Sequence, residues 1–235
     1  MVDCLSDRKY LWIFAAFILV QVGNQRGPAA GWFLRYQLNM SLDIQGKMQS
    51  WTQPAIMILS FPFGWLVDRF KPSRMLVPWL VAWALTDLVS YFVLRGPWSL
   101  LICSLITGVT SLGYRLCVST LTPEIYPREK LGQFCSCSAT LQSIVCMGTI
   151  LIVSWLGDHL GIGKWQFVYL WATVFHLLGA VCFTKVCYDL YRAEHAATLE
   201  PKCHVCGCSL VNSPAVCPEC GTDLSSVAPD IVSGA

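Results

Sequence analysis

The sequence predicts an all-α membrane protein in which six transmembrane helices precede a small cysteine-rich domain. Composition is the first observation, because 55% of the 235 residues are hydrophobic and only 13% are charged, against about 25% in an average soluble domain. The second is a series of six apolar stretches of membrane-spanning length. The third is a pair of identical cysteine motifs near the C-terminal end.

Each apolar stretch is long enough for one crossing of a bilayer. A helix of about 20 apolar residues crosses about 30 Å of hydrocarbon, and a chain this short has no polar shell to cover six such helices in water. The first stretch is too long for a cleaved signal peptide, and its N-terminal flank has no net positive charge. The stretches are residues 10–34, 48–67, 75–94, 98–121, 132–156 and 165–187.

The distribution of lysine and arginine predicts the orientation of the helices. With six crossings both termini share a side, and that side has ten Lys and Arg residues against four on the other. Cytoplasmic loops are the ones enriched in positive charge. We therefore expect a multi-pass protein with both termini in the cytoplasm, where disulfides among the thirteen cysteines are not expected.

A cluster of charges separates the second and third stretches. Residues 64–76 read GWLVDRFKPSRML and include Asp68, Arg69 and Arg74. A cytoplasmic loop explains the basic residues, but it explains neither the aspartate nor the nearby Gly64. The segment resembles the loop between the second and third helices in each half of the major facilitator superfamily.

A second segment resembles the same superfamily. Residues 123–133 read PEIYPREKLGQ, which is similar to the segment after the fourth helix of a half, most common among sugar and organic-ion porters. Glu124 and Arg128 match that pattern, whereas Lys130 and Leu131 displace the arginine that usually precedes the glycine. The two segments lie two helices apart, as the superfamily requires.

The resemblance covers roughly residues 10–188 and implies secondary transport of a small solute by alternating access. Members of the superfamily have two six-helix halves with the substrate between them, so this chain resembles one half, with features that favour the C-terminal half. It would then need a second six-helix bundle, either a copy of itself or a separate chain. The residues that the resemblance implies in a cytoplasmic latch are Gly64, Asp68, Arg69, Arg74, Glu124 and Arg128.

Polar residues inside the first stretch are candidates for the substrate path. Gln21, Asn24 and Gln25 share one helical face, because they are three and four residues apart. Gly27 and Pro28 follow closely and indicate a bent or locally opened helix. The alternative is that the face forms hydrogen bonds between helices. Further candidates for the path are Arg26, Gln53, Arg115 and Gln142.

Ionisable groups deep in a span usually face a cavity or a partner. Arg115 is expected either to bind an anionic substrate or to pair with Glu124, and the pair is the preferred interpretation. Asp87 is a candidate for a coupling proton, although a neighbouring partner or a partly solvated surface is the more ordinary explanation. His176 is interpreted as a packing residue.

The composition changes at the end of a transmembrane domain that comprises residues 1–188. We expect a polar linker at 189–200, a zinc ribbon at 201–225 and a disordered tail at 226–235. The ribbon contains C-x-x-C-G-x-x-L twice, and four thiolates close a tetrahedral structural zinc site that has no open position for catalysis. The expected ligands are Cys203, Cys206, Cys217 and Cys220.

Several functions are disfavoured. From Tyr188 onward the chain has six acidic and two basic residues, so we expect no nucleic-acid binding. The sequence has no phosphate-binding loop, nucleophile elbow or H-E-x-x-H motif, and it therefore predicts no enzyme. The expected partners are the lipid bilayer, a small-molecule substrate and the second bundle. A second hypothesis stays open, in which the chain is a membrane-anchored zinc-ribbon adaptor or a truncated transporter remnant without transport activity.

Overall fold

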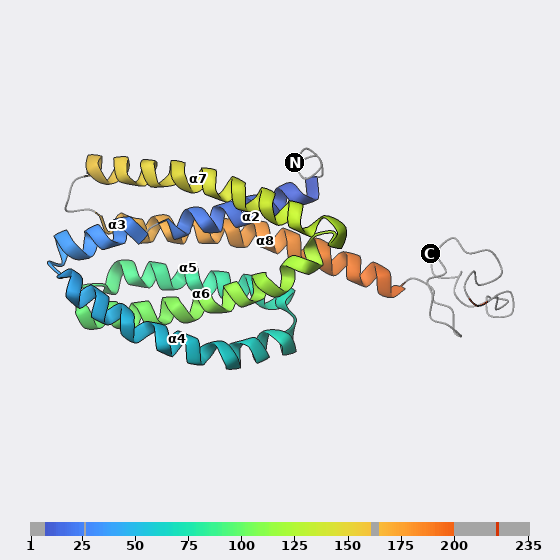
Figure 1. Cartoon of the computed structure of the whole chain (residues 1–235), viewed down its shortest axis with the longest axis horizontal. Coiled ribbons are helices and arrows are strands. Elements are labelled where there is room, and N and C mark those ends of the chain that lie inside the picture. The colour runs from blue at the N-terminus through green and yellow to red at the C-terminus, as the bar shows by residue number, and fades with distance from the viewer. Residues whose placement is uncertain (1–7, 26, 161–164, 200–219, 221–235) are drawn as a thin grey trace. The chain divides into compact units, whose positions relative to one another are not determined.

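The computed structural model describes residues 8–25, 27–160, 165–199 and 220, and in these residues the regular structure is helical throughout. The chain divides into two compact units, Met1–Cys187 and Tyr188–Ala235. The first unit contains the helices that bear on function (Figure 1). The predicted zinc ribbon and C-terminal tail lie outside the described residues, apart from Cys220.

The first predicted span is an interrupted helix. Helix α2 (Arg8–Asn24) ends where the sequence predicts a bend, and α3 (Gly27–Trp32) begins three residues later. A short π-helix, η1 (Phe33–Gln37), follows directly and ends the span. Near such an interruption backbone groups are released from the helical hydrogen-bond ladder, which makes this part of the helix suited to contact a polar ligand.

The remaining helices alternate with short connections. Ser41 caps the helix after η1, because its side chain accepts a hydrogen bond from the backbone N–H of Ile44 at 3.3 Å. Pro72 and Pro97 occupy the first positions of the two following helices, where the missing N–H of proline does no harm. The helices are α4 (Leu42–Phe70), α5 (Pro72–Val93), α6 (Pro97–Ile125), α7 (Leu131–Leu160) and α8 (Phe167–Leu199), with the 3₁₀ turn η2 (Arg128–Lys130) before α7.

Four helices in the described part of the chain are long and apolar enough to cross a membrane, namely α5, α6, α7 and the segment Phe167–Arg192 of α8. Helix α2 has only 17 residues, fewer than a crossing needs by itself. Helix α4 has 29 residues, but its first third reads LDIQGKMQSW and is largely polar. The six predicted spans are thus matched by four, and the other two stay predictions.

Helices of the first three predicted spans pack against helices of the last three, an arrangement that we call exchanged packing. Helix α4 packs on α6, while α7 packs on α2 and α3. Helix α5 also packs on α6, and α8 contacts α2, where the rings of Phe17 and Phe183 lie 5.3 Å apart. In Figure 1, α4 and α7 accordingly lie at opposite edges of the helical unit. The second helix of each group of three therefore lies against the first helix of the other group.

Two glycines allow helices to approach closely. A Cβ atom at Gly113 of α6 would overlap the ring of Trp79 on α5, and one at Gly23 of α2 would lie 2.9 Å from ring atoms of His176 on α8. Small residues at such crossings let side chains of the neighbouring helix pack against the backbone, which is the usual way that membrane helices associate. The result is tight packing around the middle of the unit.

Candidate functional site

A cavity lined by both polar and apolar side chains lies between α2, α6 and α7, and we call it the central cavity. Its volume is about 370 Å³, within the range of small-molecule sites. Helix α5 contributes Trp83 to its wall. The described residues that line it are Phe17, Gln21, Asn24, Trp83, Tyr114, Arg115, Val118, Thr122, Tyr126, Cys135, Ser138, Ala139 and Gln142.

Four of the predicted path residues meet at this cavity, although they come from three helices. Gln21 and Asn24 belong to α2, Arg115 to α6 and Gln142 to α7. Arg115 is residue 19 of the 29 in α6, and Gln142 is residue 12 of the 30 in α7. The cavity therefore extends from the middle of the helices, at Arg115 and Gln142, toward the end of α6 and the start of α7, where Thr122 and Cys135 line it.

The amide side chains keep hydrogen-bonding capacity for a ligand. Asn24 donates from Nδ2 to Oε1 of Gln21 at 3.5 Å, and Gln142 donates from Nε2 to Oγ of Ser138 at 2.8 Å. Each amide has two N–H donors and an acceptor oxygen, so these contacts orient the groups without using all of their capacity. All three side chains are partly buried. The wall of the cavity is thus polar and preorganised on the α2 and α7 sides.

Arg115 does not form the ion pair with Glu124 that was the preferred interpretation of the sequence. It forms no ion pair with Glu124 or with any other side chain in the described part of the chain. The two residues belong to the same helix and are nine positions apart, which is about 13.5 Å along the axis. The guanidinium is exposed in the central cavity instead.

The other predicted path residues lie elsewhere. Gln25 donates from Nε2 to Sγ of Cys146 at 3.0 Å and lines a separate cavity of about 260 Å³, together with Asp158. Gln53 is exposed on α4 and lines neither of these cavities. Arg26 is outside the described residues. The face predicted on the first helix is therefore divided between two cavities.

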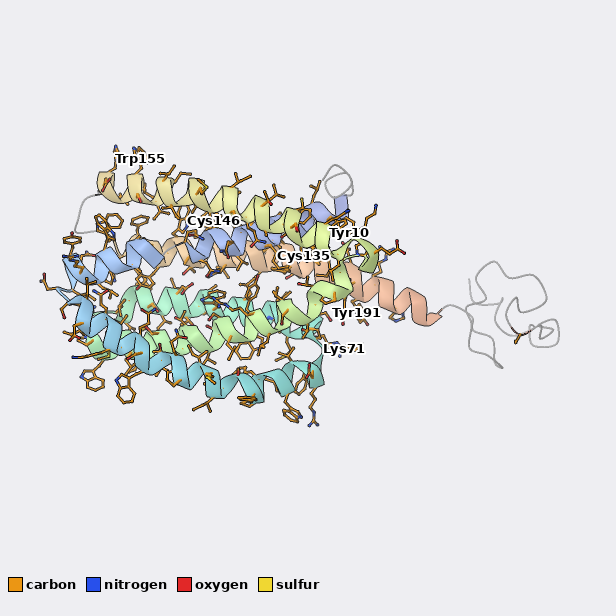
Figure 2. The ribbon with its side chains drawn as sticks, viewed as in Figure 1. Tyr10, Lys71, Cys135, Cys146, Trp155 and Tyr191 are labelled. Carbon is orange, nitrogen blue, oxygen red and sulfur yellow. The ribbon has the colours of Figure 1, made fainter. Side chains whose placement is uncertain are left out.

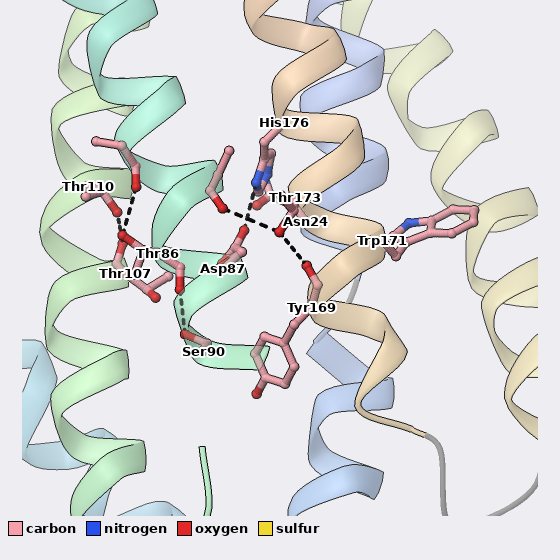
Figure 3. A network of polar contacts seen from close by, with 12 residues as sticks. Asn24, Thr86, Asp87, Ser90, Thr107, Thr110, Tyr169, Trp171, Thr173 and His176 are labelled. Atoms are coloured by element: carbon pink, nitrogen blue, oxygen red, sulfur yellow. Dashed lines mark hydrogen bonds and ion pairs between the residues drawn. The ribbon is translucent and has the colours of Figure 1, made fainter. Parts of the chain in front are cut away.

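Asp87 is fully buried and pairs with His176. Oδ2 of the carboxyl lies 2.9 Å from Nδ1 of the imidazole, and neither side chain is exposed. The pair joins α5 to α8 within a wider set of polar contacts (Figure 3), in which Thr173 donates to the backbone oxygen of Tyr169 at 2.8 Å. The packing role assigned to His176 was thus incomplete, because the residue is the partner of the one acid that the sequence placed deep in a span.

Trp83 separates this pair from the central cavity. Its ring lies 4.3 Å from the ring of His176 and also forms part of the cavity wall. It stands one helical turn before Asp87 on α5. A change in the pair can therefore reach the cavity through a single side chain.

The described latch residues gather at one end of the helices. Asp68 and Arg69 lie in the last turn of α4, Arg74 in the first turn of α5 and Glu124 in the last turn of α6. Figure 2 shows Lys71, which connects α4 to α5 with a φ of 62°, at the same end as Cys135. The side chain of Arg128 lies outside what the structure describes.

These residues form no ion pair among themselves in the described part of the chain. The guanidinium of Arg69 lies 5.3 Å from the ring centre of Trp65 instead. At Gly64 an added Cβ atom would meet nothing within 4 Å, so none of the described helices packs closely there. The face of α4 that carries the motif is open.

The predicted zinc ligands Cys203, Cys206 and Cys217 are outside the described residues, and Cys220 is exposed. Within the described ranges no group of three or more His, Cys, Asp or Glu side chains could hold a metal ion. The zinc prediction therefore stays a prediction.

Several apolar helices of membrane-spanning length, with a cavity between them that contains polar groups, indicate a multi-pass integral membrane protein. The family model described as Major Facilitator Superfamily matches residues 11–209, and the chain belongs to that superfamily. Its members are transporters that move small solutes across the lipid bilayer, not enzymes. No curated protein and no solved structure matches the chain.

Proposed function

We propose that the chain is one six-helix half of a secondary transporter and moves a small solute by alternating access, with the central cavity as its share of the substrate site. The observation that supports this proposal is the meeting of Gln21, Asn24, Arg115 and Gln142 at one cavity near mid-depth. Polar groups at that depth cost free energy unless a cavity or partner compensates them. A transport path explains why polar side chains lie at this depth, because they would contact the solute there.

The exchanged packing of the helices supports the same proposal. In major facilitator halves, two inverted three-helix repeats are nested in each bundle. Here the groups α2–α5 and α6–α8 contact each other through matching pairs, α4 on α6 and α7 on α2. Under this proposal the first span runs through α2 and α3 and the second is α4, which completes six crossings.

The second bundle faces the open sides of α4 and the central cavity. Large apolar side chains are exposed on the outer helices, including Phe61 at 77% on α4 and Leu151 at 72% on α7. Some of this surface faces lipid, but the latch residues near Asp68 have no charged partners in ion-pair contact among the described residues. We propose that the second bundle supplies them, and that the latch end and both termini are cytoplasmic.

We further propose that the pair Asp87–His176 holds a coupling proton. A proton taken up by the pair changes its charge by one unit in an apolar layer, where charge is costly. Trp83 contacts both the pair and the cavity, so the protonation state of the pair and the occupancy of the cavity can influence each other. Whether proton uptake favours binding or release of the solute depends on which protonation state of the pair binds the solute more tightly.

The assembly is the first test of the proposal. The chain has a mass of 26.2 kDa, and we expect the protein-only mass in mild detergent to be about twice that value, because a major facilitator needs two bundles. Light scattering with mass spectrometry of the subunits measures it and distinguishes a homodimer from a complex with a different half. A stable monomer without any partner would contradict the proposal and favour the adaptor or remnant.

We propose a structural zinc ion for the cytoplasmic tail, held by Cys203, Cys206, Cys217 and Cys220, with the ribbon as a protein-interaction module. The purified chain is expected to contain about one zinc per chain. The double variant Cys203→Ser/Cys206→Ser should lose it, because two thiolates do not close a tetrahedral site. Elemental analysis after dialysis measures the zinc content, and Cys208→Ser is the matched control, since this cysteine stands at a variable position of the first motif and is not one of the four expected ligands. Equal zinc in both variants would reject the assignment.

A further inference from the structure

We infer that the central cavity binds an organic anion and that Arg115 holds its negative group. The inference rests on the proposed function, because it names the class of solute that the transporter takes. It arises from the charges around the cavity, from the acids elsewhere in the chain and from the chemistry of the remaining wall.

Arg115 gives the cavity a positive charge that no lining residue balances. Among the described residues of the wall it is the only charged side chain, and none of the others is acidic. It lies ten residues before the end of α6, which is about 15 Å inside the helix end. A guanidinium at that depth needs a counter-charge or water around it, since burial of an isolated ion is strongly unfavourable.

The acids of the described helices do not provide the counter-charge. Asp87 is fully buried and bound to His176, with Trp83 between that pair and the cavity. Glu124 is nine residues further along α6 and forms no ion pair with Arg115. We therefore infer that the negative group of a bound solute provides the counter-charge.

The rest of the wall indicates the body of that solute. Aromatic rings of Phe17, Trp83 and Tyr114 line the cavity, and amides of Gln21, Asn24 and Gln142 add hydrogen-bonding groups. A guanidinium binds a carboxylate through two parallel hydrogen bonds. A small carboxylate with a flat or apolar body matches this set of groups better than an amine, a metal ion or an uncharged sugar.

Three probes of nearly equal size separate charge from shape. Benzoate, benzamide and benzylammonium are titrated into the purified complex, and the thermal unfolding midpoint is followed, because a ligand that binds the folded state raises it. We expect benzoate to raise the midpoint, benzamide to raise it less and benzylammonium to have no effect. A larger shift with benzylammonium than with benzoate would overturn the inference, and so would the absence of a shift with benzoate up to the solubility limit.

Substitutions test whether Arg115 itself binds the negative group of benzoate. Arg115→Gln is expected to raise the Kd of benzoate at least about tenfold, since charge-assisted hydrogen bonds are lost, while Arg115→Lys retains part of the affinity. Arg95→Gln is the matched control, because this exposed arginine lies between α5 and α6, away from the cavity. An unchanged Kd in folded Arg115→Gln would overturn the assignment. A two-bundle complex that does not bind benzoate would reject the substrate class and leave the proposed function standing.

Discussion

Replacing Asp87 by leucine is expected to destabilise the protein by about 3–5 kcal/mol, because removal of one member of a buried pair leaves the other without its counterpart in an apolar layer. Both side chains have no exposed surface, and Nδ1 and Oδ2 lie 2.9 Å apart. The free energy of unfolding can be measured by titration with a denaturing detergent in mixed micelles. Loss of less than about 1 kcal/mol would contradict a paired, fully desolvated carboxyl.

The double variant Asp87→Leu/His176→Phe separates the pair from packing alone. Apolar residues of similar volume often replace a buried pair at little cost or with a gain in stability, and the phenylalanine ring preserves the contact with Trp83. We therefore expect the double variant to recover most of the stability lost in either single variant. Its transport should no longer depend on a pH gradient, since the proton site is gone. Full pH dependence in the stable double variant would exclude the pair as the coupling site.

The pairing of Asp87 with His176 could have been foreseen from the sequence. Each is an isolated ionisable residue in an apolar stretch, and each lies in the third span of its group of three. The cost of a buried charge makes the pairing of two such residues a reasonable expectation. Hydrophobicity alone does not show it, because a histidine on an apolar face resembles any other packing residue. The distance between the two helices was the missing information.

The central cavity shows the same division between what sequence predicts and what it leaves open. Spacing places Gln21 and Asn24 on one helical face, because the periodicity of the helix is fixed. It does not show that Gln142 and Arg115 join them, since that depends on how α6 and α7 pack on α2. Gln25 was grouped with that face, yet it contacts Cys146 and a second cavity. Successive side chains of a helix point about 100° apart around its axis, so Asn24 and Gln25 can contact different neighbours.

Sequence motifs predict where the latch segments lie. The superfamily pattern also assigns these segments contacts with neighbouring helices, and the described helices do not show those contacts. Gly64 has open space where a helix would approach, and Asp68 has no ion pair in the described part of the chain. Under the proposed function these partners belong to the second bundle, and the pattern of a single half does not show contacts between bundles. The same limit applies to the tail, where cysteine spacing predicts zinc but the structure describes only Cys220 of the four ligands.

Asp68→Asn is expected to reduce transport strongly while the protein remains folded and inserted, because the latch end closes less readily. Under the proposed function, Asp68 accepts hydrogen bonds from a cation of the second bundle in the closed state. Loss of such a charge-assisted contact, worth about 1.5–3 kcal/mol, shifts the population toward the open state by about tenfold or more. Cys135 reports this shift, because it lines the central cavity near the latch end of α7.

The measurement is the rate at which a membrane-impermeant maleimide labels Cys135, followed by mass spectrometry of the modified peptide. The rate should rise about tenfold or more in Asp68→Asn, because labelling follows the fraction of molecules that are open at the latch end. Asp43→Asn is the matched control: it makes the same change at the opposite end of α4, where the carboxylate forms only an exposed pair with Lys47 at 2.8 Å. An exposed pair of this kind contributes little, so labelling should stay at the wild-type rate. If uptake and labelling are both unchanged in Asp68→Asn, the charge at the end of α4 does not govern access to the cavity, and the latch must be sought among the residues near Glu124.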